Sequence, residues 1–290
     1  MSRDMNRREW LKGAAASAVM LAAAPPLFAA PVRDYAAQLA ELERVHGGRL
    51  GVAILDTGNG RYIAHRADER FLMCSTFKLL LAAAVLARVD HGVEELDRRV
   101  MFDKATLLDW SPVTQLYAGP PGMTVAALCQ AAITMSDNTA ANLLLASSGG
   151  PAAVTRYARS LGDTLTRLDR SEPTLNHADG EKDTTTPRAM LGDIHKLLLG
   201  DALAASSRGQ LVDWLQHCQT GAASLRAGLP ADWRTGDKTG SGVAATNDVA
   251  ILWPPARKPL LVTAYYDNGQ LPASERRAVL AEVGRIAAAG

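Results

Sequence analysis

Ser75 and Lys78 are the first residues in this chain whose types and spacing suit chemistry. They open a run rich in leucine and alanine, residues 75–89, which predicts a helix with both side chains on one face, one turn apart. A serine hydroxyl becomes a nucleophile when a neighbour accepts its proton, and a desolvated lysine can do so. Backbone N–H groups at the helix start favour a developing oxyanion. The same pattern also fits a serine that only caps the helix beside a solvated lysine.

Two further polar motifs follow along the chain, Ser136-Asp137-Asn138 and Lys238-Thr239-Gly240. The first lies between two helical patterns, where an ordinary loop is the simplest interpretation. The second lies on a predicted strand, where lysine and threonine can bind a carboxylate and glycine allows a ligand to approach the backbone closely. An exposed edge strand protected by lysine is the alternative. Each motif is weak alone, and the signal is the three together in this order.

The ordered set S-x-x-K, S-D-N and K-T-G resembles the class A β-lactamases and the penicillin-binding proteins. A polar stretch without periodicity, residues 167–186, is long for a connection in a compact domain, which is a hint of function. Its segment RSEPTLN, residues 170–176, is similar to the class A loop pattern R-x-E-x-x-L-N. There Glu172 and Asn176 would hold one water above an acylated serine, whereas penicillin-binding proteins lack that glutamate. A solvated loop acid is the alternative for Glu172.

The resemblance implies a mechanism. Ser75 would attack the lactam carbonyl and pass its proton either to Lys78 or, through a water, to Glu172. The N–H groups of Ser75 and Ser241 would bind the oxyanion, and Ser136 would relay a proton to the departing ring nitrogen. Glu172, with Asn176, would then activate the water that releases the acyl group.

The resemblance also implies the substrate contacts. The substrate-binding residues would be Trp110, Asn138, Lys238, Thr239, Gly240, Ser241 and Arg277. Within this set the strand residues and Arg277 would receive the substrate carboxylate, Asn138 would bind the side-chain amide, and Trp110 would gate the site. Arg170 and Asp183 would form an ion pair that closes the ends of the loop.

The resemblance implies hydrolysis of penicillins and cephalosporins and leaves two other functions to consider. One is a D,D-peptidase of the penicillin-binding class, and the other is a non-hydrolysing β-lactam sensor in which a stable adduct is the signal. Glu172 and Asn176 argue against both, because they supply the deacylating water. A generic serine esterase would carry G-x-S-x-G around its nucleophile, and Ser75 lacks that motif.

The elements that must position these residues change in type along the chain. Strand patterns occur towards both ends and helical patterns fill the middle. We predict strands at residues 50–56, 61–65, 233–240, 248–253 and 260–266. We predict helices at residues 34–44, 75–89, 124–135, 140–146, 152–161, 187–199, 207–217 and 274–287.

These elements predict an α/β (α+β) fold. A mixed domain, residues 31–66 and 214–290, would hold a mainly antiparallel sheet flanked by N- and C-terminal helices. An all-helical domain, residues 67–213, would be inserted into it and would include the active-site loop 167–186. The active site would lie between the two.

The first thirty residues are typical of an export signal. The segment NRREWLK, residues 6–12, precedes an uncharged run rich in alanine and leucine, residues 13–30. Paired arginines followed by an aromatic residue, leucine and lysine suit a twin-arginine signal, so we predict export to the periplasm by that machinery. The alternative is a membrane anchor, but a spanning helix needs about 20 apolar residues and Pro25-Pro26 interrupts this run.

Composition and charge exclude several classes of function. The chain is 48% hydrophobic and 21% charged with a net charge of +1, which suits a globular enzyme and provides no basic face for nucleic acid. The pairs Arg98-Arg99 and Arg276-Arg277 are predicted to be solvated helix faces. No histidine spacing suits a metal site, so we expect neither metal nor cofactor. We expect a monomer.

The cysteines Cys74, Cys129 and Cys218 are odd in number and contain no C-x-x-C pattern. By the resemblance, the positions that would pair with Cys129 and Cys74 are Ala82 and Gly242. We therefore predict three free thiols and no disulfide.

Overall fold

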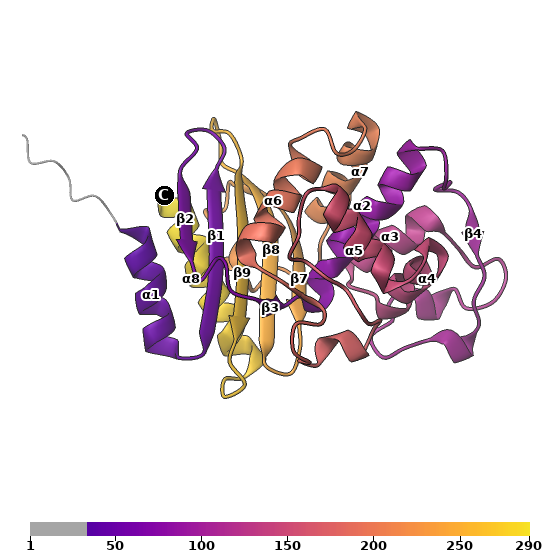
Figure 1. Cartoon of the computed structure of the whole chain (residues 1–290), viewed down its shortest axis with the longest axis horizontal. Coiled ribbons are helices and arrows are strands. Elements are labelled where there is room, and N and C mark those ends of the chain that lie inside the picture. Colours follow the sequence, from indigo (N-terminus) through magenta and orange to yellow (C-terminus); the bar gives the residue numbers. More distant parts are fainter. Residues whose placement is uncertain (1–33) are drawn as a thin grey trace, which may run out of the picture. The chain divides into compact units, whose positions relative to one another are not determined.

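A five-stranded sheet is the frame of the structure, a computed structural model that describes residues 34–290 (Figure 1). The predicted signal, residues 1–30, lies outside the described residues. The strands of this sheet are β1 (Arg49–Asp56), β2 (Tyr62–His65), β7 (Arg234–Ser241), β8 (Ala245–Trp253) and β9 (Leu260–Asp267). Their spatial order is β2-β1-β9-β8-β7, and every neighbouring pair is antiparallel.

Alternate residues of each strand supply the two faces of the sheet, since successive strand side chains point in opposite directions. In β9, Val262 and Ala264 join one apolar cluster, whereas Leu261 and Tyr265 join the other. The first cluster also contains side chains of α1 (Tyr35–His46) and α8 (Ala273–Ala289). Figure 1 shows these two helices on one side of the sheet.

The other helices lie on the opposite side of the sheet (Figure 1). They are α2 (Phe77–Asp90), α3 (Val125–Thr134), α4 (Asn138–Ser148), α5 (Pro151–Ser160), α6 (Pro187–Leu198) and α7 (Ala205–Gln216). Of these, α6 and α7 contact the sheet and the rest pack around α2. Helix α2 is buried along nearly its whole apolar length, which explains its continuous run of leucine and alanine. Side-chain oxygens of Thr124, Asp137 and Thr186 cap α3, α4 and α6 by accepting a backbone N–H of the first turn.

The predicted fold class is confirmed, and the predicted helices and strands are present with ends shifted by up to three residues. The short elements were not predicted, because a strand of two residues shows no periodicity. These are the ribbons β3 (Phe71–Leu72) with β6 (Thr184–Thr185) and β4 (Arg99–Val100) with β5 (Met123–Thr124). The division of the chain after residues 66 and 213 stays a prediction, since residues 34–290 cluster as one unit.

The prediction that two arginine pairs form solvated helix faces is wrong in part: Arg98 and Arg99 are exposed but not helical, and Arg276 is helical but buried. Arg276 is buried, and its guanidinium donates to Thr246 Oγ1 and to the carbonyl oxygen of Leu271. Arg98 and Arg99 lie outside any helix, where Arg98 pairs with Glu94 and Arg99 belongs to β4. Two adjacent arginines in the sequence therefore do not predict that both are exposed, because nearby oxygens can bind a buried guanidinium. Within residues 34–290, no helix is long and apolar enough to cross a membrane.

Candidate active site

Ser75 lies in a tight turn directly before α2. The turn Cys74–Thr76 is a 3-10 element, so the α-helix begins two residues later than predicted. Cys74 has a φ of 45°, a left-handed conformation that is strained for a residue with a side chain. Asn247 on β8 clamps the turn by donating to the carbonyl oxygens of Leu72 and Met73, at 2.8 and 3.0 Å. Tertiary contacts thus hold the serine in place.

Gly240 on β7 packs against the same turn. A Cβ atom at this position would lie 2.7 Å from the carbonyl oxygen of Met73 and 3.2 Å from the backbone nitrogen of Thr76. Any side chain would therefore push the strand away from the serine. The close approach that glycine permits here is between two parts of the protein.

Lys78 is fully buried one turn after the serine. Its Nζ donates to the carbonyl oxygen of Ser136 at 2.8 Å and to Oδ1 of Asn138 at 2.7 Å, and it lies 3.0 Å from Oε1 of Glu172. Burial lowers the pKa of Lys78, because the charged form loses its hydration, while the Glu172 carboxylate opposes that shift. An amine in this setting can give up a proton more readily than an exposed lysine.

Glu172 is buried beside the nucleophile, and its two oxygens have different partners. Ser75 Oγ donates to Oε1 at 3.2 Å, and Asn176 Nδ2 donates to Oε2 at 2.6 Å. The backbone of Glu172 is held from α4 by Asn142, whose amide accepts from its N–H at 3.0 Å and donates to its carbonyl at 2.9 Å. The carboxylate therefore touches the nucleophile while its main chain is fixed on both sides.

Ser136 brings a second hydroxyl between two lysines. Its Oγ lies 3.1 Å from Lys238 Nζ and 3.5 Å from Lys78 Nζ, and its backbone has a φ of 57°. Burial lowers the pKa of Lys238 to about 8, a shift that the positive charge of Lys78 also favours. A hydroxyl between two such amines is placed to receive and pass on a proton.

Asp137 connects this turn to the segment that carries Trp110. Its buried carboxylate accepts the N–H groups of Val113 and Thr114 at 3.0 and 2.9 Å. Trp110 is 61% exposed, and its indole N–H donates to the carbonyl oxygen of Met135 at 3.0 Å. An aromatic side chain therefore stands at the rim on a fixed support.

A cleft of about 590 Å³ opens above these groups. The predicted site residues that line it are Ser75, Trp110, Ser136, Asn138, Asn176, Thr239, Ser241 and Arg277. Lys78, Glu172 and Lys238 do not line the cleft but contact residues that do. The four sequence motifs thus meet in one place, with their hydroxyls and amides at the cleft surface and Lys78, Glu172 and Lys238 beneath them.

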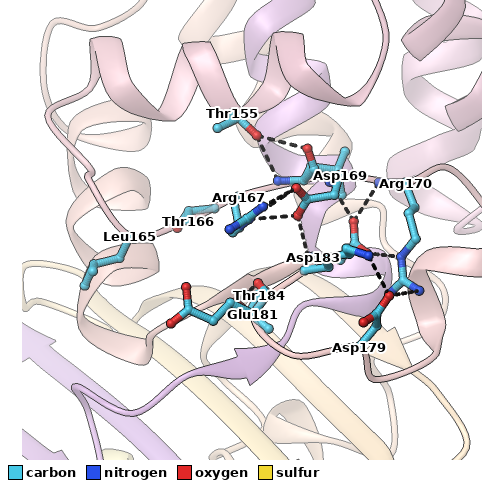
Figure 2. Close-up of polar contacts among 12 residues, drawn as sticks. Thr155, Leu165, Thr166, Arg167, Asp169, Arg170, Asp179, Glu181, Asp183 and Thr184 are labelled. Atoms are coloured by element: carbon cyan, nitrogen blue, oxygen red, sulfur yellow. Dashed lines mark hydrogen bonds and ion pairs between the residues drawn. The ribbon is translucent and has the colours of Figure 1, made fainter.

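Arg170 and Asp183 meet near the ends of the loop, as Figure 2 shows. Arg170 Nε lies 2.6 Å from Oδ2 of the buried Asp183, whose Oδ1 accepts the N–H groups of Asp169 and Arg170. The carbonyl oxygen of Asp183 accepts from the N–H of Met73 at 2.9 Å. The end of the loop is therefore joined to the turn of the nucleophile.

A family model described as the β-lactamase enzyme family matches residues 34–289. The chain belongs to this family. It is 52% identical over 256 residues to β-lactamase L2 of Stenotrophomonas maltophilia, covering 87% of this chain and 84% of that protein. It is 46% identical over 280 residues to β-lactamase OXY-2 of Klebsiella oxytoca, covering 93% and 96%. An ancestral (GNCA) class A β-lactamase structure shares 62% identity with a TM-score of 0.85, covering 87% of this chain and 98% of that one.

Membership of the β-lactamase family confirms the resemblance drawn from the motifs. It does not by itself assign a role to any single side chain. Three supporting residues had no sequence signal of their own: Asn142, Asn247 and Thr220. Asn142 and Asn247 act through contacts with distant segments, and Thr220 lies 2.5 Å, Oγ1 to Oγ1, from Thr239 at the cleft. Asn142 and Asn247 lie in the stretches SDNTAANLLL and TNDVAILW, which resemble the family, but the resemblance assigned neither asparagine a role.

The three thiols of this β-lactamase-family chain are all buried and unpaired in the described structure. Burial raises the pKa of each thiol, to about 11 for Cys218. A Cβ at Gly242 would lie 3.0 Å from Cys74 Sγ, so these two positions are neighbours.

Proposed function

We propose that the protein is a class A serine β-lactamase. It hydrolyses the β-lactam amide of penicillins and cephalosporins through an acyl-enzyme on Ser75 and so confers resistance to these antibiotics. The observation that carries this proposal is the position of Glu172, which is within hydrogen-bonding distance of both Ser75 Oγ and Asn176 Nδ2. A group so placed can serve the attack on the substrate and the later attack by water.

Acylation begins with attack of Ser75 Oγ on the lactam carbonyl carbon. The serine proton goes either to Glu172, at 3.2 Å, or to Lys78, whose lowered pKa suits a base once it has lost a proton. The N–H groups of Ser75 and Ser241 bind the oxyanion. Ser136 delivers a proton to the ring nitrogen as the C–N bond breaks, and the lysine beside it replaces that proton.

Substrate binding uses the opposite wall of the cleft. Thr239 and Ser241 on β7, on either side of Gly240, receive the substrate carboxylate at the cleft surface, while the buried Lys238 beneath them and Arg277 on α8 add positive charge. Asn138 binds the side-chain amide and keeps Lys78 in place at 2.7 Å. Trp110 covers the substrate at the rim.

Deacylation separates this function from its rivals. Glu172 takes a proton from a water that attacks the acyl carbonyl, and Asn176 orients that water. The Oδ1 atom of Asn176 has no partner among the described residues and can accept a hydrogen bond from it. A D,D-peptidase or a non-hydrolysing sensor would not need this carboxylate beside the serine.

The physiological setting belongs to the same proposal. Residues 1–30 act as a twin-arginine signal, and the protein works in the periplasm as a monomer without a permanent membrane anchor. Its partner is the small β-lactam substrate, not nucleic acid. The chemistry needs no metal and no cofactor, because serine, lysine and glutamate supply the nucleophile and the bases.

The decisive experiment counts turnovers. Purified protein is mixed with a molar excess of a chromogenic cephalosporin, and the equivalents opened per molecule are recorded. Many turnovers are expected. A burst of one equivalent that then stops would show that Glu172 does not deacylate the serine, and the peptidase or sensor function would replace this proposal.

A further inference from the structure

Two buried aspartates meet at the base of the loop that carries Glu172. Asp163 follows α5, before the loop, and Asp193 lies on α6, after it. Both side chains are at least nine-tenths buried, and the two carboxyls are within hydrogen-bonding reach of each other. In each, Oδ2 is buried without a donor among residues 34–290. Two ionised carboxylates so placed repel each other, whereas one proton between them satisfies both oxygens.

The pair lies where the chain enters and leaves the loop. Asp163 Oδ1 accepts the N–H groups of Leu165 and Thr166 at 2.7 and 3.0 Å. From there Thr166 Oγ1 lies 2.6 Å from Thr185 Oγ1 on the returning strand. We call these two segments, residues 163–166 and 184–185, the neck of the loop. Figure 2 shows Leu165 and Thr166 on one side of it and Thr184 on the other. Displacement of Asp163 would therefore loosen Thr166, and with it the contact between Thr166 and Thr185 that joins the two segments of the neck.

The charges around Asp193 do not supply the missing donor. The titratable groups that act on or respond to Asp193, besides Asp163, are Tyr157, Arg159, Lys196 and Tyr265. Arg159 donates to the carbonyl oxygens of Asp163 and Thr166, and Lys196 donates to that of Leu161. Burial, followed by the charge of Asp163, raises the pKa of Asp193 to about 9, while Lys196 and Arg159 oppose the shift.

We propose that Asp193 is a positioning residue for deacylation, in which its protonated carboxyl donates a hydrogen bond to Asp163 and so holds the neck of the loop that carries Glu172. This role rests on the proposed function, in which Glu172 activates the deacylating water. When the pH rises, the shared proton is transferred to hydroxide, the two carboxylates repel each other, and the neck loosens. Loss of the proton from Asp193 at alkaline pH thus changes the position of Glu172, which lies more than twenty residues away along the chain.

The sign of the effect on stability follows from the proton balance. Between the ordinary pKa of an aspartate and about 9, the folded protein binds one more proton at this pair than the unfolded chain does. Its stability therefore falls as the pH rises through this window. Asp193→Asn removes the effect, because a carboxamide donates to Asp163 at every pH.

The first experiment compares unfolding of the wild type and Asp193→Asn between about pH 5 and about pH 9, with Asp201→Asn, an exposed aspartate, as the matched control. The ratio of their unfolding constants, wild type over Asp193→Asn, should rise by up to about tenfold per pH unit. Lysine titrations cancel in this ratio. The infrared spectrum of the wild type minus that of Asp193→Asn should show a protonated-carboxyl band near neutral pH; the subtraction removes the contribution of Asp248, another buried acid whose pKa is raised by burial. A flat ratio, or a difference spectrum without that band, would overturn the proposal.

The second experiment measures deacylation in single turnovers over the same pH range and above it. Deacylation by the wild type should slow above about pH 9 relative to Asp193→Asn, and Asp193→Ala should be slow at every pH. A constant ratio of wild-type to Asp193→Asn rates would exclude a positioning role. If neither protein turned over a β-lactam, the proposed function would fail and the role in deacylation with it. The unfolding ratio and the infrared band would still decide whether the pair holds a proton.

Discussion

Two ion pairs lie within the active-site region, and their surroundings give them different uses. Lys78 and Glu172 meet at 3.0 Å with both side chains fully buried, and the same Glu172 oxygen also accepts from Ser75. Arg170 and Asp183 meet at 2.6 Å, and each Asp183 oxygen is occupied by a donor. The first pair shares its atoms with a nucleophile and can change its protonation. The second is saturated, so it serves to hold the loop.

The largest effect is expected from removal of Ser75, the nucleophile that contacts the Lys78–Glu172 pair. Ser75→Ala should abolish turnover, a loss on the order of 10⁶-fold in kcat, because it removes the cleft hydroxyl that donates to Glu172. Steady-state hydrolysis of a chromogenic cephalosporin measures it. Circular dichroism and the melting temperature should stay near those of the wild type, and residual turnover within tenfold of wild type would refute the assignment.

Removing the carboxylate should separate the two half-reactions. Glu172→Ala is expected to acylate and then stall, since deacylation loses a general base worth about 10²–10⁴-fold. Intact mass spectrometry should find the acyl adduct. Rapid hydrolysis without an adduct would show that another group activates the water. The neighbouring exposed Ser171→Ala is the matched control and should behave as wild type.

Breaking the second pair should affect stability before chemistry. Arg170→Leu leaves the buried Asp183 carboxylate without its cation, at a cost of about 3 kcal/mol in the free energy of unfolding. Deacylation should slow, because the loop carries Glu172, whereas the acylation burst is retained. Arg167→Leu, which breaks a more exposed pair with Asp169, should cost clearly less, because solvent screens that pair. Equal losses in the two variants, measured by chemical denaturation, would contradict the comparison.

The dependence of kcat/KM on pH tests the role of Lys238 beneath the cleft. Because burial lowers the pKa of Lys238 to about 8, its positive charge is lost as the pH rises through that value. The substrate carboxylate should then bind less well, and kcat/KM should fall by up to about tenfold per pH unit above it. Lys238→Arg keeps its charge and should move this limb to higher pH. An unchanged profile would mean that another group controls it.

The smallest effect concerns a side chain close to both pairs. Cys74 is buried, and the charges of Glu172 and Asp183 both disfavour its thiolate. It should react slowly with thiol reagents in the folded protein, as should Cys129 and Cys218. Unfolding without a reductant should release three reactive thiols per chain. Fewer than three would show a disulfide.

Much of the fold followed from local pattern. The short apolar run of β9 and the unbroken leucine and alanine run of α2 predicted elements that the structure contains, because a strand covered on both faces and a buried helix both need continuous apolar residues. The burial of Arg276 was missed, because it depends on acceptors at Thr246 and Leu271, about 30 and five residues away. Two-residue strands such as β3 and β6 were missed for a related reason, since only pairing defines them.

The sequence by itself determined the family, the fold class and the candidate site residues, because four motifs in series are specific even though each alone is common. Only the tertiary structure decided how those residues meet. It decided that Glu172 touches Ser75, that Gly240 is needed where β7 meets the turn of the nucleophile, and that Asp163 and Asp193 share the neck of the loop. Type and spacing specify which chemistry a residue can perform. The protonation state and partners of a buried group depend on contacts between segments that are distant in the chain.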